Sequence, residues 1–227
     1  MHLLGRDQGV TIYGPIGLEQ IVRSQLEVSG ARLNFGVNFV NLDGKTSWKL
    51  FEDKLIEIHT FPLKHRVPTN GFIIKEKTKE YSLLGELFKA DGLSLTFIPK
   101  FKKGENVIDE NGKTHYFEDY TTPPPPTKSY AYCSDTIYYE NIIPHIFDVD
   151  LLYHEATFTE EFKTRAKATF HSTAIDAATI ALKSNVKKLL LGHLSARYEN
   201  GIEHLTEAKT IFENVEVVED GVTYEIV

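Results

Sequence analysis

The sequence predicts an α/β fold, in which helices are layered against a sheet. Three observations support this prediction. Beyond residue 128, short apolar segments alternate with helix-like segments, as in layered α/β proteins. The chain has 227 residues, of which 41% are hydrophobic and 25% are charged, as in ordinary globular domains. A chain of this length also buries a core without disulfide or metal cross-links.

The N-terminal part predicts a strand, a helix and then a run of further strands. Residues 10–13 (VTIY) are β-branched or aromatic, residues 14–17 (GPIG) are typical of a turn, and residues 18–28 have helical spacing. Period-two alternation and the turn at Asp43 and Gly44 then predict antiparallel strands. These strands cover residues 34–42, 48–51, 55–61 and 71–75.

The middle of the chain, residues 77–128, has a looser pattern. It contains a basic cluster at residues 100–103 (KFKK), a hairpin-type turn at 110–113 (ENGK) and four prolines at 123–126. We interpret this region as an exposed insertion with solvated charges.

The C-terminal part carries the strand and helix alternation. Apolar segments predict strands at 129–133, 151–153 and 187–191, and helical spacing predicts helices at 138–147, 173–183 and 205–212. Residues 215–218 and 222–227, separated by Asp220 and Gly221, predict a closing hairpin. We find no internal repeat and no linker, so we expect one domain.

Charge and composition exclude several classes of protein. The formal net charge of −7 argues against a protein that coats nucleic acid by bulk attraction, although a local basic groove remains compatible with it. Cys133 is the single cysteine, which excludes an internal disulfide and fits a reducing compartment. No apolar run approaches the roughly 20 residues that span a bilayer, and the first residues lack a signal-peptide pattern. We therefore expect a cytoplasmic protein without membrane association.

Polar side chains recur just after the predicted strands. They are Asp135, Glu155, His171 at the start of a helix, and His193, and His65 precedes another strand. Because ligands of open α/β sheets bind at the carboxyl ends of strands, these residues can converge on one site. Each also has an ordinary structural interpretation, as a hydrogen-bonded histidine or as a helix cap. Spacing alone therefore indicates only a metal or hydrolytic site.

Longer stretches resemble the ribonuclease Z family, whose members are metallo-β-lactamase-fold endonucleases that trim the 3′ end of precursor tRNA. The resemblance rests on residues 132–136 (YCSDT), 154–158 (HEATF), 171–174 (HSTA) and 192–198 (GHLSARY), and residues 3–17 and 63–68 (LKHRVP) resemble other parts of the same family. It implies an αββα sandwich that is incomplete at its N-terminus. We expect a single partial domain over residues 1–227, with an inserted arm at about 78–128.

The resemblance also implies roles for individual residues. His65, Asp135 and His193 would be zinc ligands, and Asp135 would bridge two ions. Glu155 and His171 would be catalytic, because Glu155 orients an imidazole that protonates the leaving oxygen. The implied substrate is precursor tRNA, cut to leave a 3′-hydroxyl. The implied substrate-binding residues are Ser195, Arg197, Tyr198, Lys100, Lys102 and Lys103.

One diagnostic motif of the family, His-x-His-x-Asp-His, is absent from all nine histidines of the sequence. In the family it precedes the segment matched here by residues 3–17, so we expect a chain shortened at its N-terminus. The remaining ligands would be divided between two ions, and catalytic zinc normally needs three protein ligands. We therefore expect weak or absent zinc binding and little nuclease activity from this chain alone. The family resemblance further implies a homodimer.

The arm and the function each leave alternatives open. Residues 81–103 lack the Gly-Pro pair typical of bacterial arms, yet Lys100, Lys102 and Lys103 with Phe97 and Phe101 are compatible with a surface for phosphates and bases. Two other functions remain open. One is a different metallo-β-lactamase-fold phosphodiesterase, and the other is a non-catalytic RNA-binding or dimer-partner module.

Overall fold

The computed structural model describes residues 5–226, which divide into two compact units. Unit 1 comprises the described residues up to Phe51, residues 58–74 and those from Ser129 onward. Unit 2 comprises residues 52–57 and 75–128. The expectation of one domain with an insertion stays a prediction, because this division does not decide it.

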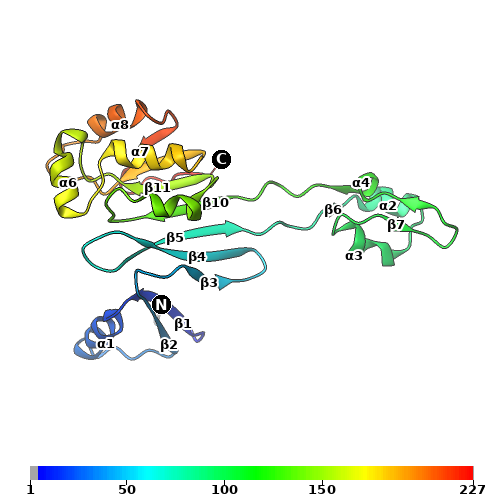
Figure 1. The fold of residues 1–227 in the computed structure, drawn as a ribbon. Helices are drawn as coiled ribbons and strands as arrows, with labels where there is room; N and C mark the ends of the chain where they lie inside the picture. The colour runs from blue at the N-terminus through cyan, green and yellow to red at the C-terminus, as the bar shows by residue number, and fades with distance from the viewer. Residues whose placement is uncertain (1–4, 227) are drawn as a thin grey trace. The chain divides into compact units, whose positions relative to one another are not determined.

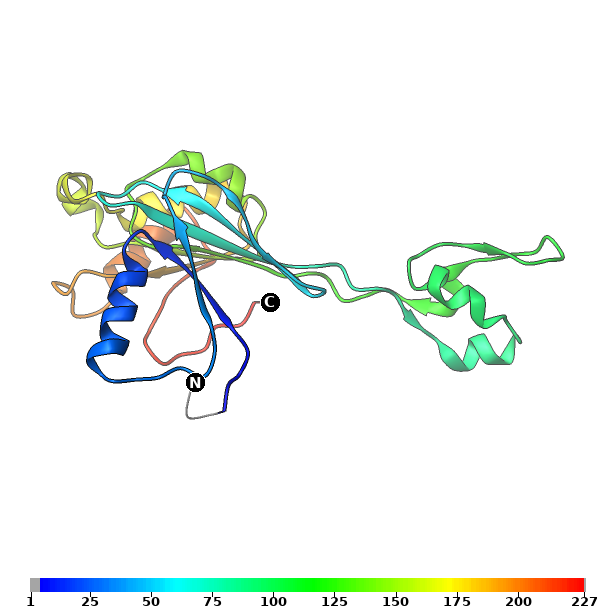
Figure 2. The same ribbon diagram turned by 90° about the horizontal axis from the view of Figure 1, so that it is seen from below.

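Unit 1 begins with a strand, a helix and a second strand. These are β1 (Val10–Pro15), α1 (Leu18–Val28) and β2 (Val37–Leu42), and Figure 2 shows α1 beside the two strands in blue. β2 pairs with β1 in parallel, in a sheet of its own. The expected antiparallel pairing was therefore wrong for this segment. The intervening helix crosses back before β2 starts, which makes two successive strands run in the same direction.

The large sheet has seven strands in the order β13-β12-β11-β10-β5-β4-β3. Pairing from β10 to β13 is parallel. The strands are β3 (Trp48–Glu52), β4 (Ile56–Leu63), β5 (Thr69–Glu76), β10 (Ser129–Cys133), β11 (Leu151–Glu155), β12 (Lys188–Gly192) and β13 (Val215–Val217). The predicted strands agree with these bounds to within a few residues. Parallel strands need a crossover between them, and here helices supply it.

The helices of unit 1 follow these strands. They are α5 (Ile143–Ile146), α6 (Lys163–Thr169), α7 (Ala174–Lys183) and α8 (Ile202–Lys209), with single turns of 3₁₀ helix at Glu140–Ile142 and Glu160–Phe162. Figure 1 shows α7, in yellow, lying along β10 and β11. Its buried face is made of Ala174, Ala177, Ala178, Ile180 and Ala181. The four small alanine side chains let the helix pack closely on Leu152, Leu189 and Leu191 of the same core.

The start of α7 is sharply defined. The Thr173 hydroxyl accepts a hydrogen bond from the Asp176 amide, and the Asp176 carboxylate accepts one from the Thr173 amide. This capping box satisfies two amides that a helix end leaves free. The N-cap of the helix thus lies two residues after His171 in the chain.

The C-terminal end differs from the expected hairpin. Residues 222–226 form no strand, and the Tyr224 hydroxyl instead accepts a hydrogen bond from the Glu219 amide. The Asp220 and Gly221 turn exists, but residues 222–226 after it are not part of a strand. A turn signal alone was therefore insufficient to establish a strand.

Unit 2 has a small core of its own. Its elements are β6 (Ser82–Leu83), α2 (Gly85–Ala90), a 3₁₀ turn (Leu95–Phe97), α3 (Ile98–Phe101), β7 (Val107–Ile108), β8 (Thr114–His115), α4 (Phe117–Tyr120) and β9 (Thr121–Thr122). Phe88, Phe101, Val107 and Tyr120 are buried together. The predicted 110–113 turn connects β7 to β8, which pair as an antiparallel hairpin. The region is thus more ordered than the loose pattern indicated.

Across the described residues, no helix combines the length and the apolar character that crossing a membrane requires.

Candidate metal and catalytic site

The sheet of unit 1 collects acidic and imidazole side chains along one edge. Asp135 lies two residues beyond β10, Glu155 is the last residue of β11, and His193 directly follows β12. Because these three strands are parallel neighbours, their carboxyl ends meet at the same edge. His65 follows β4 by two residues. His171 comes from the segment before α7.

Asp135 faces two imidazoles through different carboxylate oxygens. Its Oδ2 lies 3.9 Å from Nε2 of His65, and its Oδ1 lies 3.5 Å from Nε2 of His193. Donor atoms of His65, Asp135 and His171 all lie within 4.8 Å of one another, as do those of Glu155, His171 and His193. Imidazole nitrogens and carboxylate oxygens are the donors that zinc takes in proteins. The chemistry of this donor set fits a metal cofactor.

The loops that carry Asp135 and His65 are tied together by Thr136. Its hydroxyl accepts a hydrogen bond from the Lys64 amide at 3.1 Å, and the Ile137 amide donates to the Lys64 carbonyl at 2.9 Å. The Ser172 hydroxyl in turn donates to the Thr136 carbonyl at 2.7 Å. Three loops distant in sequence are therefore held by short bonds, which limits the movement of the side chains beside them.

Glu155 and His171 form a hydrogen-bonded pair. Nδ1 of His171 lies 2.8 Å from Oε1 of Glu155, whose side chain is fully buried. The pKa of His171 is raised above its ordinary value, chiefly because Glu155 accepts this hydrogen bond, while partial burial acts in the opposite direction. Asp135 adds a further negative charge nearby. The imidazolium form of His171 is consequently favoured.

Glu155 remains a carboxylate despite its burial. Burial by itself would raise the pKa of Glu155, but hydrogen bonds from His171, Thr157 and the Thr136 amide together outweigh it, and the pKa is lowered. Bonds to the charged form always act in this direction. The pair therefore has a charged acceptor and an imidazole whose Nε2 is left for other partners.

His193 has an unusual backbone, with a φ of +57°. Such left-handed conformations are uncommon for residues other than glycine and persist where the surroundings enforce them. Before it, Gly192 allows a close approach, because a Cβ added there would lie 2.3 Å from the Tyr153 hydroxyl oxygen. The glycine therefore lets the end of β12 pass close beside the Tyr153 side chain.

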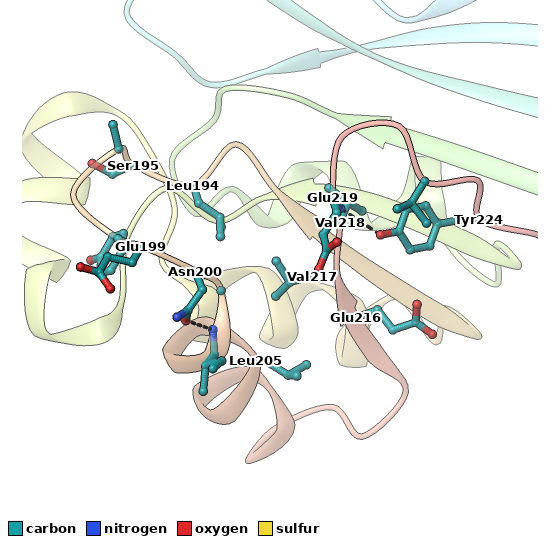
Figure 3. A pocket seen from close by; sticks show the side chains of 15 residues that line it. Leu194, Ser195, Glu199, Asn200, Leu205, Glu216, Val217, Val218, Glu219 and Tyr224 are labelled. Atoms are coloured by element: carbon teal, nitrogen blue, oxygen red, sulfur yellow. Dashed lines mark hydrogen bonds between the residues drawn. The ribbon is translucent and has the colours of Figure 1, made fainter.

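Two of the predicted substrate-binding residues, Ser195 and Tyr198 in the loop after β12, line a pocket that the predicted metal ligands do not line. Ser195 and Tyr198 line a pocket of about 880 Å³ between this loop and the segment after β13, where neither His193 nor Asp135 belongs to the lining (Figure 3). The Tyr198 hydroxyl accepts a hydrogen bond from the Thr159 amide at 3.0 Å. Tyr198 therefore has a structural role, because this bond ties its loop to the main chain at Thr159.

Arg197 is held between aromatic rings. Its guanidinium carbon lies 5.1 Å from the ring centre of Phe158 and 4.7 Å from that of Phe162. Nε of Arg197 also donates to the Ser195 hydroxyl at 3.1 Å. These ring contacts and the Nε hydrogen bond restrict the orientation of the guanidinium group, whose two terminal nitrogens take no part in the bond to Ser195.

The predicted lysines belong to unit 2. Lys100 lies in α3, and Lys102 and Lys103 follow it, with Lys102 Nζ 4.0 Å from Glu80. Phe101 is fully buried in the core of unit 2, so the idea that it offers a stacking face was wrong. The turn is amphipathic: Phe101 points into the core of unit 2, whereas Lys100 is exposed to solvent.

Sequence reasoning missed several residues that hold this site. Thr136, Thr157 and the main-chain oxygen of Phe170 each bond a side chain of the predicted set. Their contacts are made across loops, and no spacing in the sequence signals them. His154, which stands beside Glu155 in its motif, is buried, and its Nδ1 bonds the Glu155 carbonyl at 2.7 Å.

Comparison with known proteins yields relatives for almost the whole chain. No family model matches it. The chain is 39% identical over 225 residues to a ribonuclease Z of Cytophaga hutchinsonii, covering 99% of this chain and 72% of the relative. It is 38% identical over 221 residues to a ribonuclease Z of Parabacteroides distasonis, covering 97% of this chain and 73% of the relative.

Two solved structures share the fold. The short form of human tRNase Z superposes with a TM-score of 0.63 at 23% identity, covering 99% of this chain and 70% of the other. The metallo-β-lactamase fold protein YhfI of Bacillus subtilis gives a TM-score of 0.58 at 17% identity, with 97% and 67% covered. The expected metallo-β-lactamase fold is therefore confirmed.

Proposed function

This chain belongs to the ribonuclease Z family, and on that premise we propose that it is a zinc-dependent endoribonuclease chain that removes the 3′ trailer of precursor tRNA. The observation that carries the proposal is the meeting of Asp135 with His65 and His193 beside the Glu155–His171 pair. Imidazole nitrogens and carboxylate oxygens that converge in this way would suit a metal ion that takes part in phosphodiester hydrolysis.

His65, Asp135 and His193 would hold the metal in this proposal. A zinc ion held by these residues would supply Lewis acidity for phosphodiester cleavage. The chain's own contribution to the chemistry is a proton at His171. Its Nδ1–H is engaged by Glu155, so the proton for the leaving 3′-oxygen is on Nε2. The raised pKa of His171 favours the protonated form that such a donor needs.

The number of protein ligands limits how tightly this chain binds zinc. Asp135 with one imidazole gives two protein ligands on each side, and catalytic zinc normally has three. The His-x-His-x-Asp-His motif is absent from the sequence. We accordingly propose weak zinc binding and little nuclease activity for the chain as given.

The direct experiment compares two proteins on a labelled precursor tRNA. One is this chain, and the other is this chain preceded by the histidine-rich segment of a relative. Zinc-dependent release of the trailer by the second protein, leaving a 3′-hydroxyl, is the expected result. A His171→Gln variant should lose the activity, and His145→Gln in α5, outside the candidate donor sets, is its matched control. Cleavage of a chromogenic phosphodiester without cleavage of the tRNA would overturn the proposal in favour of another phosphodiesterase.

The lysines of unit 2 are proposed as contacts for tRNA phosphates. In the described part of the chain, the Lys100 and Lys103 side chains form no ion pair, so their charges are available. Replacing both by alanine should weaken tRNA binding and reduce the salt dependence by about one unit of slope per lost contact. Lys209→Ala in α8 is the control. An unchanged salt slope would contradict this role.

Homodimer formation and a cytoplasmic location stay predictions. Light scattering at several concentrations measures the first, since a dimer has twice the chain mass of 25.8 kDa. Tagged expression in the native cell measures the second.

A further inference from the structure

We infer that the hydroxyl group of Thr157 is a positioning group that fixes the tautomer of His193, so that Nε2 of His193 carries a lone pair toward Asp135. The inference rests on the proposed function, because it concerns a residue that we propose as a metal ligand. Its basis is a count of donors and acceptors around Glu155.

The carboxylate of Glu155 is surrounded by four donors. Its Oε1 accepts from the Thr136 amide and from Nδ1 of His171, each at 2.8 Å. Its Oε2 accepts from the Thr157 amide at 3.1 Å and from the Thr157 hydroxyl at 2.7 Å. A carboxylate can only accept, so the single hydroxyl hydrogen of Thr157 is directed to Glu155.

The Thr157 hydroxyl oxygen then has only lone pairs left for its other neighbours. Those neighbours are Nδ1 of His193 at 2.9 Å and Nδ1 of His171 at 3.2 Å. Both nitrogens must therefore carry hydrogen. One donor and two acceptor positions are the full capacity of a hydroxyl group, and all three are used here.

The consequence for His193 follows from the chemistry of a neutral imidazole, which carries one hydrogen on its two nitrogens. With the hydrogen on Nδ1, Nε2 is the free base, and it lies 3.5 Å from Oδ1 of Asp135. A metal ion binds the nitrogen that has the lone pair. Glu155 thus orients His171 directly and His193 through Thr157.

The main chain keeps Thr157 in this position. Its carbonyl accepts a hydrogen bond from the Ser195 amide at 3.1 Å, within the loop that carries His193. Thr157 is 7% exposed, so water has little access to replace its hydroxyl group. Outer partners of this kind typically change metal affinity or activity 10- to 100-fold when they are removed.

Nuclear magnetic resonance of the ¹⁵N-labelled metal-free chain tests the inference. Spectra recorded at about pH 8.5, two units above the ordinary histidine pKa, distinguish a protonated from an unprotonated ring nitrogen. We expect protonated Nδ1 and unprotonated Nε2 for His193. Thr157→Val should lose this single tautomer, and Thr157→Ser should retain it. Thr206→Val, in α8, is a matched control that leaves His193 unchanged.

Two results would overturn the inference. One is a wild-type His193 with hydrogen on Nε2, and the other is a folded Thr157→Val chain with the His193 tautomer unchanged. If Thr157→Val does not fold, the wild-type and Thr157→Ser spectra decide the question. Failure of the proposed function is recognised separately, because it appears as absent tRNA cleavage by the extended chain while this tautomer is observed.

Discussion

Nδ1 of His65 lies 2.8 Å from the main-chain oxygen of Phe170, 105 residues later in the chain. A carbonyl oxygen only accepts, so His65 carries its hydrogen on Nδ1 and presents Nε2 to Asp135. Phe170 ends α6 in the left-handed conformation, with φ +59°. That turn brings its carbonyl to the imidazole, so a helix end in one loop orients a proposed ligand in another.

Substitution at Phe170 should therefore depend on the shape of the side chain. Left-handed backbone costs β-branched residues most, so Phe170→Val should lower the free energy of unfolding by about 1–2 kcal/mol. Phe170→Asn should be tolerated, because asparagine adopts this conformation readily. Urea unfolding measures the difference. Phe147→Val is the control, since Phe147 is exposed with φ −61°. Equal losses at Phe170 and Phe147 would contradict the argument.

Glu155→Gln should lower the pKa of His171. The variant removes the negative charge and the acceptor that raise this pKa, while the burial that lowers it persists. The variant should also lower the free energy of unfolding by about 1–3 kcal/mol. The amide group of glutamine cannot accept all of the hydrogen bonds that the carboxylate accepts, so a buried donor loses its acceptor. Titration of the His171 resonances in the metal-free chain measures the shift, with Glu203→Gln on α8 as control. An unchanged titration midpoint would exclude Glu155 as its cause.

Asp150 should make unit 1 sensitive to acid. Burial acts to raise the pKa of Asp150, but bonds from Lys187 and Ser129 together lower it below the ordinary 3.8. A lowered folded pKa contributes stability that is fully present above the unfolded value and is lost as the pH falls through the folded one. Asp150→Asn should thus be less stable than wild type at neutral pH.

The difference between wild type and Asp150→Asn should shrink as the pH falls below 3.8. Urea unfolding at a series of pH values measures it, and the exposed Asp7→Asn serves as control. A gap that stays constant down to the acid limit would show that Asp150 does not titrate in this way.

Gly192→Ala should disturb both the sheet and the site. The added Cβ would lie 2.3 Å from the Tyr153 hydroxyl oxygen and 2.5 Å from a ring carbon, so the Tyr153 ring or one of the two strands must shift. Overpacking of this kind costs about 1–3 kcal/mol. Thermal unfolding measures the cost, and the His193 resonances should move. Gly36→Ala, where a Cβ meets nothing, is the control. Wild-type stability of Gly192→Ala would refute the close approach.

The chain as given should retain little zinc. Elemental analysis after mild dialysis should find well under two ions per chain, because Asp135 and one imidazole provide two protein ligands on each side. Retention of nearly two ions per chain would show that other residues complete the sites.

Strand and helix positions were predictable wherever local patterns were strong. The helix at residues 18–28 and the strand at residues 129–133 begin and end as expected. The parallel pairing of β1 with β2 was not predicted, because partner choice depends on the crossover rather than on alternation within a strand. The small core around Phe88 and Phe101 was also missed, since its members come from short elements without a clear period.

By itself, the sequence determined which chemical groups the site contains. Its imidazoles and carboxylates lie at the ends of strands, within short motifs that resemble those of a known family. Only the tertiary structure decided how those groups are oriented. The bonds from Phe170 to His65, from Glu155 to His171 and from Thr157 to His193 join residues 16 to 105 positions apart. Side-chain hydrogen bonds across loops leave no periodic trace in a sequence, and they form only when packing brings the loops together.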